Sequence, residues 1–120
     1  MAAQDDILSS MNLLRDTGSQ LTSAVTEALS DQSFSLSGWE KLLSVTTQYA
    51  AKVDELMDMV DVAYDDDEID DDQEESASDF TSTSHDLAMA LTQKIFDQIK
   101  SMGGNANLLL SNYQKLFYKD

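Results

Sequence analysis

The sequence predicts an all-α fold in which a long antiparallel helical hairpin and two shorter helices form a four-helix bundle, with an acidic flexible linker between them. Two long stretches place apolar residues at alternating steps of three and four, a spacing typical of helices that bury one narrow face. No stretch shows the alternation of a β-strand, and the chain contains no proline to interrupt a long helix. The 120 residues fit one domain, 1–120.

The first helix is expected over residues 5–30. Its buried face is predicted to consist of Ile7, Met11, Leu14, Gly18, Leu21, Val25 and Ala28. Gly18 lowers the helix propensity by about 1 kcal/mol relative to alanine. Two interpretations of Gly18 stay open, because a glycine on this face either lets another helix approach closely or is tolerated at the edge of the face.

A second helix is expected over residues 37–64, after a turn-rich loop over 31–37. Ser37 and Glu40 match a capping box, with Ser37 as the N-cap. The predicted buried face is Trp39, Leu42, Thr46, Tyr49, Val53, Leu56, Val60 and Ala63, widened by Leu43, Val45, Ala50 and Met57. Because the loop is short, the two long helices are expected to form an antiparallel hairpin.

The segment 65–83 is expected to be a mobile linker, because it is rich in acidic and hydroxyl side chains and poor in apolar ones. A third helix is predicted over 84–102, with Thr83 near its start, and a fourth over 105–118 after a glycine pair. Both are too short to be stable alone, so we expect them to pack on the hairpin. The alternative is that their apolar faces bind a partner.

The acidity of the chain is concentrated in one segment. The formal net charge is −16, and residues 54–83 hold fourteen acidic residues and no lysine or arginine. Such a field attracts basic protein surfaces and repels nucleic acid and anionic membranes, so we expect a basic protein partner and no direct nucleic-acid or membrane binding. The candidate partner-binding acids are Asp58, Asp61, Asp65, Asp66, Asp67, Glu68, Asp70, Asp71, Asp72, Glu74 and Glu75. The alternative is a solvated loop that only keeps the protein soluble.

A weaker candidate contact is apolar. Trp39 lies near the predicted hairpin turn, and tryptophan is enriched at binding hot spots, although a position on the buried face favours the core. The C-terminal part of the chain contains more apolar residues than one buried face of a bundle helix needs. We expect some of these side chains to be exposed. The C-terminal candidates are Leu109, Tyr113, Phe117 and Tyr118.

The residues do not favour catalysis, a metal site or a cofactor. His85 is the only histidine, and there is no cysteine. His85 is expected at the start of the third helix, beside the mobile linker, so no catalytic triad can be assigned around it. The run from Asp65 to Glu75 lacks the central glycine of an EF-hand calcium loop. We therefore expect no enzyme activity, no metal ligands and no cofactor.

The N-terminus lacks the basic and apolar regions of a signal peptide, and the longest apolar run, residues 87–91, is too short to span a bilayer. We expect a soluble, cytoplasmic protein, with export that needs no signal peptide as an alternative.

The function favoured by these features is that of a non-catalytic interaction protein: an adaptor, an assembly or secretion chaperone, or an inhibitor. It would bind a basic or amphipathic protein through helical faces and the acidic arm. Two alternatives stay open. One is a DNA mimic that inhibits a nucleic-acid-binding protein, and the other is a self-associating secreted, virion or filament subunit, for which a homodimer would be the simplest form.

Overall fold

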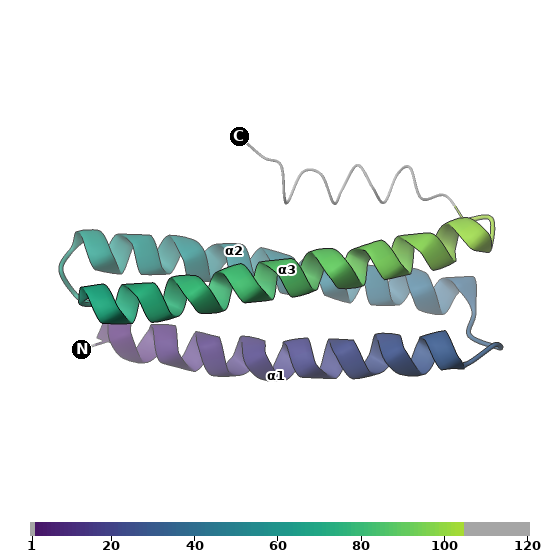
Figure 1. Ribbon diagram of the computed structural model, residues 1–120, viewed down its shortest axis with the longest axis horizontal. Helices are drawn as coiled ribbons and strands as arrows, with labels where there is room; N and C mark the ends of the chain where they lie inside the picture. The colour runs from purple at the N-terminus through teal and green to yellow at the C-terminus, as the bar shows by residue number, and fades with distance from the viewer. Residues whose placement is uncertain (1, 105–120) are drawn as a thin grey trace.

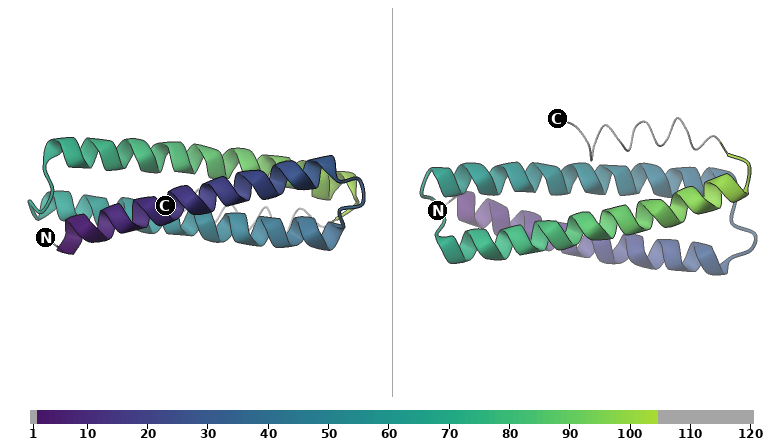
Figure 2. Two further views of the ribbon diagram at one scale, coloured as in Figure 1. Left: turned by 90° about the horizontal axis from the view of Figure 1, so that it is seen from below. Right: turned by 45° about the horizontal axis from the view of Figure 1, so that its top comes forward.

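The computed structural model describes residues 2–104. These residues form three long helices, each antiparallel to the next along the chain: α1 (Ala2–Ser30), α2 (Leu36–Asp65) and α3 (Asp71–Ser101). The helices run up, down and up beside one another (Figures 1 and 2). The start of α1 therefore lies at the same end of the bundle as the turn between α2 and α3. No strand occurs within residues 2–104, so the all-α prediction and the antiparallel hairpin are confirmed.

The core forms where the predicted helix faces meet. All seven residues of the predicted face of α1 are buried, and in α2 only Leu42 of the principal face is half-buried. Two of the four residues predicted to widen the buried face of α2 are not buried: Val45 and Met57 are 44% and 40% exposed. In α3 Leu91, Ile95 and Ile99 are buried, whereas Met102 lies beyond the helix end and is exposed.

The start of α2 is two residues earlier than predicted. Ser35, not Ser37, is the N-cap, and its hydroxyl oxygen accepts a hydrogen bond from the Gly38 backbone N–H at 3.0 Å. Phe34, just before this cap, packs edge-on against Trp39 with 5.0 Å between the ring centroids. This pair is a hydrophobic staple, which fixes the direction in which the chain enters the helix. The staple explains why the earlier serine is used.

The predicted linker over 65–83 is wrong for most of its length, because α3 begins at Asp71 and only residues 66–70 connect the helices. Asp70 is the N-cap in a complete capping box: its carboxylate accepts from the Gln73 N–H, and the Gln73 side chain accepts from the Asp70 N–H. The buried face of this part of α3 is built from small side chains: Ala77, Thr81, Ser84 and Ala88. His85 accordingly lies inside α3, not at its start.

The turn after α2 has the hydrogen bonds of a Schellman motif. The Glu68 N–H donates to the Ala63 carbonyl at 2.8 Å, and the Asp67 N–H donates to the Tyr64 carbonyl at 3.1 Å. Asp67 has a positive φ of 59°, the left-handed conformation that the motif requires. The same pattern ends α3, where Gly103 takes the left-handed position with a φ of 79°.

The predicted fourth helix, residues 105–118, lies outside the described residues, so the part of the chain that the structure describes is a three-helix bundle. Among residues 2–104, no helix combines the length and the apolar character needed to cross a membrane.

Candidate functional site: the acidic end of the bundle

The fold gathers the acidic residues at one end of the bundle. The last turns of α2, residues 66–70 and the first turns of α3 lie together there, and the start of α1 lies beside them (Figure 1). The start of α1 carries Asp5 and Asp6. We call residues 54–79, together with Asp5 and Asp6, the acidic end. Its predicted partner-binding acids are all exposed except Glu74, which is half-buried. The structure thus brings them together on ordered helices around one turn, not on a mobile arm.

Few positive charges balance the acidic end. The sequence has no lysine or arginine between residues 53 and 93. Lys52 forms an ion pair with Glu55 at 3.7 Å, and both side chains are largely exposed. An exposed pair of this kind contributes little to stability. Arg15 of α1 instead stacks over the Phe80 ring of α3, 5.3 Å from its centroid.

The two helices at the acidic end respond oppositely to its charge. Asp71, Asp72 and Glu74 lie in the first turn of α3, where the positive end of the helix dipole stabilises them. The last turn of α2 holds no basic residue, and Asp65 stands there against the negative end of the dipole. The same kind of side chain therefore stabilises the start of α3 and destabilises the end of α2.

A hydrogen bond ties these two helix ends together. The Tyr64 hydroxyl at the end of α2 donates to a carboxylate oxygen of Asp71 at the start of α3, over 2.6 Å. This hydrogen bond, followed by the negative charge of Asp71, raises the pKa of Tyr64 above its usual value of 10.0. The bond and the Schellman motif together hold the turn of the acidic end in one geometry.

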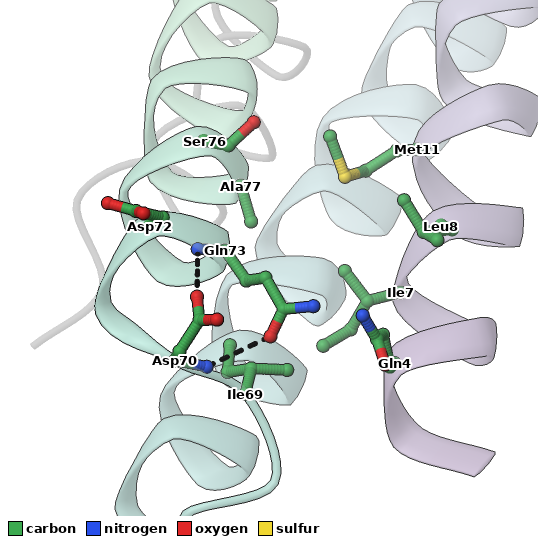
Figure 3. Close-up of a pocket in the computed structure, with 10 residues that line it drawn as sticks. All are labelled: Gln4, Ile7, Leu8, Met11, Ile69, Asp70, Asp72, Gln73, Ser76 and Ala77. Atoms are coloured by element: carbon green, nitrogen blue, oxygen red, sulfur yellow. Dashed lines mark hydrogen bonds between the residues drawn. The ribbon is translucent and has the colours of Figure 1, made fainter. Parts of the chain in front are cut away.

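A groove lies between α1 and α3 at the acidic end (Figure 3). Its apolar floor comes from α1, the turn and α3, and its volume is about 250 Å³. Leu8 lies at this groove with 52% of its surface exposed, whereas Ile69, the one apolar residue of the acidic turn, is only 7% exposed. The lining residues are Gln4, Ile7, Leu8, Met11, Ile69, Asp70, Asp72, Gln73, Ser76 and Ala77. We call this the Leu8 groove.

The apolar candidates from the sequence are not at this site. Trp39 is 2% exposed and belongs to the core at the other end of α2, which agrees with the alternative that its position on the buried face offered. Leu109, Tyr113, Phe117 and Tyr118 lie outside the described residues. The Leu8 groove was missed because residues 7–11 and 69–77 are far apart in sequence. The isolated Ile69 and the Asp70–Gln73 capping box were its only local signals.

The single histidine lies in a separate groove between α2 and α3, together with Asp61, Ser78 and Ser82. This grouping joins the residue types of a catalytic triad, which the sequence did not predict. Catalysis would need the serine hydroxyl to donate to the histidine. The Ser78 hydroxyl, one of the two serine hydroxyls at this groove, donates to Glu74 at 2.9 Å. Within residues 2–104, no three side chains of metal-binding type are grouped so that they could hold an ion.

Comparisons with known proteins identify no relative of this chain. No protein-family model matches the sequence, and neither the curated proteins nor the solved structures yield a match. The site therefore has to be interpreted from its own chemistry, which is a rigid, exposed array of carboxylates beside a shallow apolar groove.

Proposed function

We propose that this protein is a non-catalytic interaction protein whose acidic end binds a basic surface of a partner protein. The observation that supports the proposal is the ordered grouping of carboxylates from three helix ends, with no lysine or arginine between residues 53 and 93. A concentrated negative field raises the association rate of a basic partner and orients it before contact. Rigid helices lower the entropy that binding would otherwise remove from a flexible arm.

The test compares two variants that remove the same number of charges from opposite ends of the bundle. In the first, the exposed acids Asp58, Asp61 and Asp65 become asparagine. In the matched control, Glu27→Gln, Glu40→Gln and Asp97→Asn remove three exposed acids away from the acidic end. Each protein is used to isolate partners from native lysate at about 50 mM and 500 mM NaCl, a range over which surface electrostatics are strongly screened.

We expect the original protein and the control variant to retain the same basic proteins at low salt and to release them at high salt. The acidic-end variant should retain much less of them. Partners that bind all three proteins equally, or that are retained equally at high salt, would refute a role for the acidic end.

A second candidate function is mimicry of nucleic acid, supported by the arrangement of acids along α2. Asp58, Asp61 and Asp65 follow the three–four spacing of one helix face, so their carboxylates repeat about every 5 Å along a rigid axis. Duplex DNA also carries its charges in a regular row, at about 3.4 Å per strand along its axis, so the likeness lies in the regular order of the charges and not in their interval. Duplex DNA that displaces an isolated partner from the acidic end would favour mimicry, whereas a partner with no affinity for DNA would exclude it.

A further inference from the structure

We infer that the Leu8 groove is the docking site for an amphipathic, basic helix of the partner, whose apolar side chains enter the groove while its lysines or arginines face the surrounding carboxylates. This inference rests on the proposed function and names the chemistry of the partner segment. It makes a further claim, that recognition at the acidic end depends on apolar pattern as well as on charge.

The groove has the dimensions of a helix-binding site. Its α1 residues Gln4, Leu8 and Met11 lie on one helix face about one turn apart, so the groove extends for roughly 10 Å along the bundle. Two apolar side chains one turn apart on a partner helix would fit this length. A volume of about 250 Å³ suits such anchors and is below the usual size of a small-molecule site.

The charge around the groove selects the sign of the partner. Asp70 and Asp72 line it from the start of α3, and Asp5 precedes Leu8 by three residues on the same side of α1. Asp70 accepts from the Gln73 N–H, and Figure 3 shows the Asp72 side chain pointing to the outer side of α3. A second copy of this acidic protein would meet strong like-charge repulsion here, whereas a basic helix would not.

A patterned peptide tests the inference directly. The first probe is a 14-residue peptide of leucine and lysine with leucines at the i, i+3, i+4 and i+7 spacing of one helix face. The second has the same composition in an order that gives no apolar face. Binding is measured by fluorescence anisotropy, and the methyl signals of Leu8, Met11 and Ile69 are followed by NMR.

Two matched variants locate the binding site. Leu8→Ser removes an exposed apolar side chain from the groove. Leu13→Ser makes the same change at a residue of α1 that is 66% exposed and lies in a different groove, against α2. Both side chains are exposed, so both variants should fold, and circular dichroism checks this.

We expect the patterned peptide to bind about tenfold more tightly than the scrambled one, to shift the groove methyl signals, and to lose about tenfold in affinity with Leu8→Ser only. Equal binding of the two peptides, or equal effects of the two variants, would overturn the groove while leaving the proposed function intact. No binding of either peptide would overturn both. A dimer of the protein that dissociates with Leu8→Ser would show that the groove serves self-association instead.

Discussion

Asp67 occupies a backbone position at which helices usually place glycine. Its φ of 59° costs energy because the side chain of an L-residue crowds the backbone there, although aspartate tolerates this region better than most residues. Gly103 fills the equivalent position after α3 without a side chain. The turn of the acidic end thus contains a local strain that the opposite turn avoids.

Replacing Asp67 with glycine should therefore stabilise the protein by about 0.5–1 kcal/mol in urea unfolding. Part of this gain comes from relieved backbone strain and part from one negative charge fewer at the end of α2. Asp67→Asn separates the two, because asparagine removes the charge and keeps the side chain. If the glycine and asparagine variants are equally stable, backbone strain at Asp67 contributes nothing.

Gly18 lies where side chains of the other two helices approach α1 closely, which is the first of the two interpretations that the sequence leaves open. A Cβ atom placed on Gly18 would lie 2.8 Å from the Tyr49 hydroxyl oxygen and 3.2 Å from a Leu87 methyl carbon. The ring of Tyr49 is buried and has little freedom to move away. A glycine is needed here for packing, despite its weak helix propensity.

Gly18→Ala should destabilise the protein by about 1 kcal/mol, since the clash outweighs the gain in helix propensity. In a Tyr49→Phe background the hydroxyl is gone and the nearest ring carbon lies at 3.3 Å, so the same substitution should be close to neutral. Urea unfolding of the four proteins in this cycle measures the coupling. Additive effects of the two substitutions would contradict the contact.

At the scale of the helices, the same substitution of aspartate by asparagine should change the free energy of unfolding in opposite directions at the end of α2 and at the start of α3. Asp65→Asn removes a charge that opposes the dipole of α2 and should raise the free energy of unfolding by about 0.3–0.5 kcal/mol. Asp72→Asn removes a charge that the dipole of α3 favours and should lower it by a similar amount. Thermal unfolding at low salt measures both, and effects of the same sign would show that mutual repulsion dominates over the dipoles.

The helices also show how far local sequence predicts this fold. The face of α1 was predicted completely, because leucine, isoleucine and valine mark it at regular spacing. The start of α3 was not, because Ala77, Thr81 and Ser84 form its face and acids surround it. Repulsion in this run is outweighed by a capping box, a favourable dipole and burial. The Leu8 groove depends on contacts between distant helices, which no local pattern contains.

At the scale of the whole molecule, the charge distribution predicts how stability depends on salt. Carboxylates from three helix ends repel one another at one end of the bundle, and this repulsion is screened within about 10 Å at 0.1 M salt. Raising NaCl from about 10 mM to 500 mM should increase the melting temperature by roughly 5 °C. The increase should be smaller when Asp58, Asp61 and Asp65 are asparagine. A melting temperature that falls with salt would mean that attractive charge pairs prevail.

The uneven placement of charge has a consequence for how the molecule presents itself to a partner. Because the negative charge lies at one tip of an elongated bundle, a positively charged surface exerts a torque that turns the long axis toward it. The long axis of the bundle would then lie perpendicular to the surface, and the loop between α1 and α2 would lie at the end farthest from it. Bound in this way, it would hold that loop about one helix length, roughly 45 Å, away from the partner's surface.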